Sequence, residues 1–274
     1  MHLDIKKDLA SNWFKTLQNS FCNDILKLEK KNSKFKSISW QKNYLKDEGG
    51  GEHRLLQNGK VFEKVGVNFS KVYGKFSKSF QKNIPGAEKD PRFWASGISV
   101  VMHMKNPLIP AMHFNTRYIC TTHSWFGGGM DVTPSKFDLE ERKDFHKILK
   151  KMCDRHHKDY YRKYKKWCDE YFYLPHRKET RGIGGIFFDY KKNNFEKDFK
   201  FVRDVGITFQ MIFNKVIRKK IKKKWTKKEK EQQYIKRGRY AEFNLLYDRG
   251  TKFGLKTNGN VEGILMSLPP LAKW

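Results

Sequence analysis

This sequence has few of the features that mark secreted, disulfide-bonded or membrane-spanning proteins. It contains only four cysteines, at positions 22, 120, 153 and 168, and no two of them have C-x-x-C spacing. We therefore expect reduced thiols in a cytoplasmic protein. No stretch approaches the roughly 18 consecutive apolar residues of a transmembrane segment, and the first residues, MHLDIKKDLA, lack the apolar core of a signal peptide.

Acidic residues are scarce relative to basic ones. Asp and Glu total 29 against 58 Lys and Arg, which gives a formal net charge of +29. Such a balance suits a nucleic-acid partner or an anionic surface. The lysines are spread along most of the chain, however, and no zinc-finger spacing or RNA-recognition motif accompanies them. We interpret the charge as a lysine-rich background and expect no nucleic-acid partner. A basic nucleic-acid-binding protein remains an open alternative.

The apolar pattern predicts helices before and between groups of strands. At 274 residues the chain can bury one large core, and we expect a single domain over residues 1–274. Apolar residues at steps of three or four predict an amphipathic, core-docked helix over about residues 4–30. Further helices are predicted over 136–171 and 195–224. Asp138 is expected to begin the first of these, and Thr226 with Glu229 to cap the helix that follows the second.

Strands are predicted in the centre and at the end of the chain. The central ones lie over 61–73, 98–104, 113–118 and 186–189. The C-terminal ones occupy 240–246, the residues from Phe253, and 264–268, with turns at 248–250 and 258–259. Gly49–Gly51 is expected to be a mobile connection. This arrangement indicates an α+β fold with a mostly antiparallel sheet.

The stretch from Ser96 to Pro134 gathers an unusual set of polar side chains. Both of its strands alternate with a period of two, so residues two apart share one face of the sheet. That face collects a hydroxyl, two imidazoles, an amide and a guanidinium, from Ser99, His103, His113, Asn115 and Arg117. Gly127–Gly129 then predicts a sharp turn or a close approach to a ligand, and Asp131 follows. On spacing alone, a solvated sheet face followed by a glycine turn is an equal alternative.

Several long motifs in this region resemble the oxygen-dependent coproporphyrinogen III oxidase family. HFNTRYI is followed by WFGGGMDVTP, then by YRKYKKWCDEYFYLPHRKETRGIGGIFFD and RGRYAEFNLLYDRGTKFGLKTNGNVEGILMSLPPL. Upstream, GGGEHRLLQNGKVFEKVGVNFS also fits. The motifs are collinear over roughly residues 40–274, which makes the resemblance far more specific than a lone glycine fingerprint.

The resemblance implies an activity in haem biosynthesis. Members convert two propionates of coproporphyrinogen III into vinyl groups, which yields protoporphyrinogen IX, CO₂ and H₂O₂. They use O₂ as co-substrate and no organic cofactor. The implied fold is a large sheet flanked by helices on both sides. The implied assembly is a homodimer to which residues from about 240 to 274 contribute.

The resemblance also implies roles for individual residues. His113 would donate a proton, Asp131 would accept the pyrrole N–H groups, and Arg117 would hold a propionate. Further substrate contacts are implied for Ser99, Asn115, Thr116, Asn258, Gly259 and Asn260. A divalent metal is assigned in bacterial members to positions that match His103, His113, His146 and His176. Acid–base or hydrogen-bonding roles for these histidines are the alternative.

This chain departs from the family pattern at two places. It has Asn258-Gly259-Asn260 where members carry a Gly-Gly-Arg-like triplet, and Asp189-Tyr190 where two acids are common. The missing arginine puts one carboxylate contact in doubt. A degenerate relative that binds the porphyrinogen without turning it over is therefore a further alternative.

Overall fold

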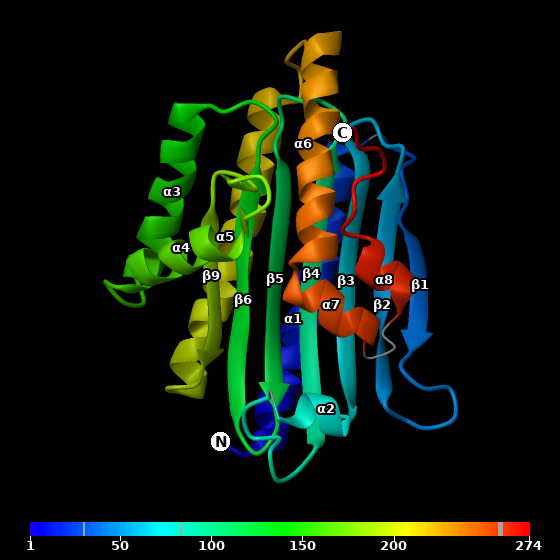
Figure 1. Cartoon of the computed structure of the whole chain (residues 1–274), viewed down its shortest axis with the longest axis vertical. Coiled ribbons are helices and arrows are strands. Elements are labelled where there is room, and N and C mark those ends of the chain that lie inside the picture. The colour runs from blue at the N-terminus through cyan, green and yellow to red at the C-terminus, as the bar shows by residue number, and fades with distance from the viewer. Residues whose placement is uncertain (30, 83, 257–259) are drawn as a thin grey trace.

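The computed structural model describes residues 1–274 except 30, 83 and 257–259 (Figure 1). Its strands are β1 (Lys36–Gln41), β2 (Gly49–Gln57), β3 (Phe62–Lys75), β4 (Arg92–Met104), β5 (Ala111–Cys120), β6 (Ser124–Thr133), β7 (Tyr173–Leu174), β8 (Glu179–Thr180) and β9 (Gly185–Lys191). Its helices are α1 (Leu3–Leu28), α2 (Lys78–Gln81), α3 (Leu139–Asp154), α4 (Tyr160–Tyr171), α5 (Phe195–Lys220), α6 (Lys227–Leu246), α7 (Arg249–Lys256) and α8 (Val261–Leu265). Among the described helices, none is both long and apolar enough to cross a bilayer.

One large sheet organises the molecule. Its strands lie in the order β1-β2-β3-β4-β5-β6-β9, and every neighbouring pair is antiparallel. From β1 to β6 the order follows the chain, so short connections suffice, as is usual for antiparallel neighbours. The predicted α+β class and the mostly antiparallel sheet are confirmed.

Alternate residues of the central strands divide the sheet into a core face and a polar face. The core face is packed against α1 and α5, and aromatic rings dominate the contact. The Phe21 ring of α1 lies edge-on to Phe114 of β5 with centroids 5.5 Å apart, and Phe114 stacks on Phe209 of α5 at 5.1 Å. The α1 and α5 helices, which are far apart in the sequence, thus pack side by side on one strand residue, and the Phe21 and Phe209 rings also contact each other at 5.7 Å.

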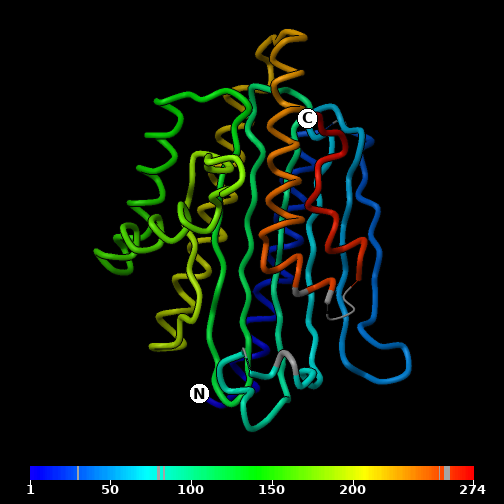
Figure 2. The backbone as a smooth tube through the Cα atoms, in the orientation of Figure 1, coloured from blue at the N-terminus to red at the C-terminus, as the bar shows by residue number. Residues whose placement is uncertain are grey.

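The polar face is the one that carries Ser99, His103, His113, Asn115 and Arg117, and the C-terminal segment covers part of it (Figures 1 and 2). Gln233 of α6 donates to the Met104 carbonyl at 2.9 Å. Asn68 of β3 donates to the Gly263 carbonyl of α8 at 3.3 Å. The sheet is thus covered by helices on both faces, as the family resemblance implied.

The expectation of C-terminal strands is wrong. Residues 240–246 continue α6, the segment from 249 forms α7, and 261–265 forms α8. The buried residues of α6 include Gln233, Arg237, Tyr240 and Asn244, which recur every three or four positions. The helical period begins near Lys227, upstream of residues 240–246. The apolar–polar alternation within those seven residues alone therefore predicted a strand where the longer pattern is helical. The predicted cap is confirmed, because Thr226 and Glu229 form a reciprocal capping box.

The mobile connection predicted at Gly49–Gly51 is wrong, because these residues belong to β2. The sharp turn predicted at Gly127–Gly129 is also wrong, because these residues lie inside β6. The alternative at Gly127–Gly129, a close approach to a ligand, stays a prediction. Gly51 pairs with Trp40, and a Cβ on Gly51 would lie 2.7 Å from the indole ring. The run therefore makes room for a neighbouring side chain within a strand, where the sequence suggested a flexible connection.

The N-terminal helix is confirmed close to its predicted bounds, and it generates a test of the core. Phe21→Ala should lower the free energy of unfolding by about 3–5 kcal/mol, because a fully buried ring would be replaced by a cavity. Urea denaturation measures this change. Ile5→Ala on the same helix is the matched control: Ile5 is exposed, and its loss should stay within about 0.5 kcal/mol. Equal losses for the two variants would contradict the docking of α1 described here.

Candidate active site

The register of β4 and β5 brings most of the predicted site residues together on the polar face. Ser99 is opposite Asn115, and Gly97 is opposite Arg117. His113 is opposite Asp131 of β6. Paired residues of antiparallel strands share a face, so the predicted clustering is confirmed. Thr116 is the exception: it belongs to the alternate set, is buried on the core face, and does not join the cluster.

A chain of three side chains forms the buried centre of this cluster. His113 Nδ1 lies 2.7 Å from Asp131 Oδ1, and Arg181 Nη2 donates to Asp131 Oδ2 at 2.6 Å. Asp131 and Arg181 are 2% and 3% exposed. Burial by itself would raise the pKa of Asp131, but the Arg181 charge and the His113 contact outweigh it, and the pKa is lowered. Asp131 is therefore an ionised, fully engaged carboxylate.

These contacts determine which imidazole nitrogen of His113 carries hydrogen. The carboxylate of Asp131 can only accept, so Nδ1 is the donor. Nε2 lies 3.0 Å from Asn115 Nδ2, which makes Nε2 the acceptor of an amide N–H. Asn115 Oδ1 is buried and has no hydrogen-bond partner among the described residues. A ligand with an N–H group could use that acceptor.

Arg181 was not singled out by the sequence analysis, although it lies in the quoted motif. Its guanidinium carbon lies 4.0 Å from the centroid of Phe172, 4.4 Å from Tyr240 and 4.8 Å from Phe243. Cation–π attraction in this ring cage adds to the ion pair with Asp131. Gly182 lies against the Val132 carbonyl so closely that a Cβ would overlap it. The sequence signal that could have indicated Arg181 is that a charged residue is followed directly by Gly182, shortly before the apolar strand β9.

Arg117, farther along the polar face, forms an ion pair with Asp189 of β9. The side chain of Arg117 keeps 33% of its surface exposed, against 15% for Asp189. Nearby, Tyr171 at the end of α4 donates to Asp248 at 2.8 Å and accepts the Arg249 N–H at 3.1 Å. The start of α7 is thereby fixed to α4.

The four histidines proposed as metal ligands have separate partners. His103 Nε2 lies 2.9 Å from the Ser267 carbonyl, and His146 Nε2 lies 2.8 Å from the Ile183 carbonyl. His176 is paired with Glu242 at 2.7 Å, while His113 contacts Asp131. Within the described residues, no group of three or more His, Cys, Asp or Glu side chains could hold a metal ion. The arrangement does not fit the proposed four-histidine metal site.

The predicted Asn258–Asn260 contact is described only in part. Asn258 and Gly259 lie outside the described residues. Asn260 Oδ1 accepts from the Gly263 N–H at 2.7 Å and so caps α8. Its carbonyl-type oxygen is committed to that helix end.

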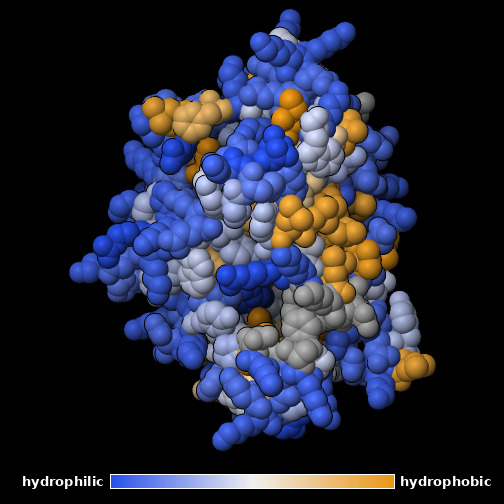
Figure 3. All heavy atoms as spheres, viewed as in Figure 1, coloured by the Kyte–Doolittle hydropathy of each residue, from blue (hydrophilic) through white to orange (hydrophobic). Residues whose placement is uncertain are grey.

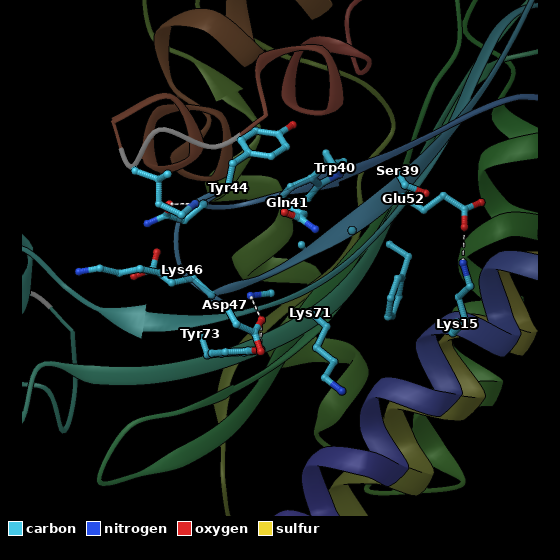
Figure 4. Close-up of a pocket in the computed structure, with 17 residues that line it drawn as sticks. Lys15, Ser39, Trp40, Gln41, Tyr44, Lys46, Asp47, Glu52, Lys71 and Tyr73 are labelled. Carbon is cyan, nitrogen blue, oxygen red and sulfur yellow. Dashed lines mark hydrogen bonds and ion pairs between the residues drawn. The ribbon is translucent and has the colours of Figure 1, made fainter.

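A separate pocket lies beside β1–β3, next to α1 and the 42–48 loop (Figure 4). Its lining includes Trp40, Lys71 and Tyr73. None of the predicted site residues lines it, and neither do Asp189 and Arg181. The acid–base and arginine groups therefore belong to the polar face of the central strands, which we take as the candidate active site.

The fold and the site define an enzyme class: an α+β protein with a buried His–Asp–Arg chain and a half-buried arginine on one face of an antiparallel sheet. The comparisons with known proteins agree. The family model for coproporphyrinogen III oxidase matches residues 10–274. Proteins named oxygen-dependent coproporphyrinogen-III oxidase from Rickettsia akari (strain Hartford), Rickettsia bellii (strain RML369-C) and Rickettsia rickettsii (strain Sheila Smith) are each 54% identical, over 98% of this chain and 98% of theirs. The chain belongs to the coproporphyrinogen III oxidase family.

Arg181→Met tests the buried ion pair. Loss of the guanidinium leaves the buried Asp131 charged, without its cation and with only the His113 hydrogen bond, so the free energy of unfolding should fall by about 3–5 kcal/mol at pH 7. Urea denaturation of the single and double variants measures the coupling. Adding Asp131→Asn should recover part of the loss, because the buried charge disappears. Strictly additive losses would show that the two groups are not coupled.

His103 should make stability depend on pH. Burial lowers its pKa to about 3, although the hydrogen bond with Ser267 acts in the opposite sense. Between about pH 6.5 and 3 the unfolded chain binds a proton that the folded chain does not, so stability is lost as the pH falls. The contribution approaches about 1.4 kcal/mol per pH unit.

His103→Gln should reduce this slope when urea denaturation is compared at pH 5 and pH 7. His2→Gln, which removes an exposed histidine, is the control and should keep the wild-type difference. An unchanged slope in His103→Gln would contradict the assignment.

Proposed function

We propose that this chain catalyses the oxygen-dependent conversion of coproporphyrinogen III to protoporphyrinogen IX. The identity to proteins that carry this name supports the proposal. The observation that carries it structurally is that Arg117 and the His113–Asp131–Arg181 chain share one face of the sheet. That face offers a cation for a propionate and an acid–base group beside it.

The balanced equation of the reaction shows that the site must supply protons. Each propionate, as –CH₂–CH₂–COO⁻, reacts with O₂ and one H⁺ to give –CH=CH₂, CO₂ and H₂O₂. The substrate is oxidised by two electrons and O₂ is reduced by two. One proton is taken up per vinyl group, so a site residue must deliver protons repeatedly. In this proposal the electron-rich pyrrole supplies the reactivity, with O₂ as co-substrate and no organic cofactor.

His113 is the proposed proton carrier. Its Nε2 accepts from Asn115, so a substrate that engages the Asn115 amide would free this nitrogen for proton transfer. Ser99 would contribute a further substrate contact. Asp131 is buried, and its two oxygens accept hydrogen bonds from His113 and Arg181. Its proposed role is therefore to orient the imidazole of His113 and to stabilise the charged form of that ring. This differs from a direct contact between Asp131 and the pyrrole nitrogens.

The overall charge fits the same substrate. Coproporphyrinogen III carries four carboxylates, and a net charge of +29 would favour its approach through long-range attraction that salt weakens. A nucleic-acid-binding function is not favoured by the family membership. We propose a cytoplasmic location on the same basis.

A homodimer formed through the C-terminal stretch is part of the proposal. Apolar side chains gather over α8 and beside it in Figure 3. Leu255, Val261 and Leu271 are exposed large hydrophobic residues of this stretch. Contiguous exposed apolar surface marks interaction sites. Light scattering after size-exclusion chromatography should give twice the monomer mass, and Val261→Asp should shift it toward the monomer.

The first functional test is turnover. Anaerobic incubation with coproporphyrinogen III, followed by O₂, should yield a monovinyl intermediate and then protoporphyrinogen IX, separated by chromatography. Arg117→Ala and Asp131→Asn should each reduce turnover by a factor of about 100 or more. Asn replaces Asp131 here because alanine would leave Arg181 without its hydrogen-bonding partner.

The outcomes separate the alternatives. Substrate binding without product in the wild type would favour the degenerate relative. Full activity in both variants would overturn the residue assignment. Thr116→Ser, a change on the core face, is the control and should keep wild-type turnover.

A further inference from the structure

Arg117 and Asp189 belong to strands that are not neighbours, and their ion pair crosses the strand between them. Arg117 is on β5, Asp189 is on β9, and β6 separates the two strands. Gly127 of β6 is directly opposite Arg117 in the register. The two side chains meet over this glycine, with Arg117 Nη2 donating to Asp189 Oδ2.

The absence of a side chain at Gly127 makes the contact possible. A Cβ at this position would overlap Asp189 Oδ1 and lie 2.9 Å from Arg117 Nη2. Neither group could stay where it is if β6 carried even a methyl group there. The glycine therefore leaves a gap that the ion pair occupies.

A bulge in β9, the strand that carries Asp189, holds the Asp189 side chain in position. The register between β6 and β9 shifts between Phe126 and Gly128, and the bulged strand carries Tyr190 at φ 52°. This left-handed conformation is uncommon for a bulky residue. It directs the Tyr190 N–H to Asp189 Oδ1 at 3.0 Å, and the Tyr190 ring lies against Trp125 with centroids 5.7 Å apart. Bulges commonly redirect a side chain beside a functional site.

We propose that Asp189 is a positioning residue that holds the Arg117 guanidinium ready to bind a substrate carboxylate. A guanidinium has five N–H donors, and Asp189 occupies the Nη2 side. The Arg117 side chain keeps 33% of its surface exposed, so a ligand can reach it while Asp189 stays in place. Holding a long side chain in its binding conformation lowers the entropy lost when the ligand binds. This inference rests on the proposed function, because it takes the carboxylate to be a propionate of the porphyrinogen.

The opposite role for Asp189 would be competition, in which the substrate carboxylate displaces it from Arg117. The geometry favours positioning. Asp189 is held by the Tyr190 N–H and is the less exposed partner, so it is the fixed member of the pair. A displaced Asp189 would also leave a largely buried charge without its cation.

A binding cycle tests the inference without relying on turnover. Coproporphyrin III, the oxidised and unreactive form of the substrate, is titrated while tryptophan fluorescence reports binding. Asp189→Ala should raise Kd about tenfold in the wild-type background, which is within the usual range for coupled neighbours. In the Arg117→Ala background the same substitution should change Kd less than twofold. Asp189→Asn, which keeps an acceptor, should give an intermediate Kd.

The control is Asp90→Asn, which disrupts a second Asp–Arg pair, with Arg92 at 2.6 Å on the surface. It should leave Kd unchanged, and circular dichroism should show that all variants fold. Tighter binding in Asp189→Ala, or an equal loss in both backgrounds, would overturn the positioning role. Binding and coupling without any turnover would instead reject the proposed oxidase and leave the positioning role standing. Normal turnover without coupling would reject the positioning role alone.

Discussion

The buried ion pair between Asp131 and Arg181 is the interaction on which the rest of the site depends. A carboxylate this deep in the protein needs a fixed cation, because an unpaired buried charge costs several kcal/mol. Arg181 lies between the sheet and a ring cage that includes Phe172 and Tyr240. Because Arg181 pairs with Asp131 of β6 and contacts Phe172 at the end of α4 and Tyr240 of α6, this one cation joins the three elements into one unit. His113 takes its orientation from that unit.

Close approach of backbone and side chains is the second constraint, and glycine satisfies it within strands. Gly127 makes room for an ion pair that crosses β6, and Gly182 lets the segment that carries Arg181 lie against the end of the same strand. A Cβ atom at either position would overlap a neighbouring atom, which is Asp189 Oδ1 for Gly127 and the Val132 carbonyl oxygen for Gly182. Arg117 thus reaches Asp189 across a strand position without a side chain, and Arg181 reaches Asp131 because its neighbour Gly182 packs closely on β6.

The sequence pattern predicted the polar face well and its cover poorly. A period of two and strand pairing sufficed to place Ser99, Asn115 and His113 on one surface, because strand geometry dictates the face of each side chain. The same kind of alternation wrongly predicted a strand from Tyr240, because α6 begins upstream at Lys227 and continues through this residue. Thr116 shows the limit of a residue list taken from a motif, since its neighbours face the site and it faces the core.

The sequence by itself determined the family, the α+β class, the alternation of the central strands and the caps of the helices, since these depend on local order and on motifs. Only the tertiary structure decided which partners meet. Asp131 with Arg181, and Arg117 with Asp189, are far apart in the chain, and their pairing depends on strand order, register and one bulge. The proposed metal site shows the same distinction. Four histidines look equivalent in sequence, but packing gives each a different partner.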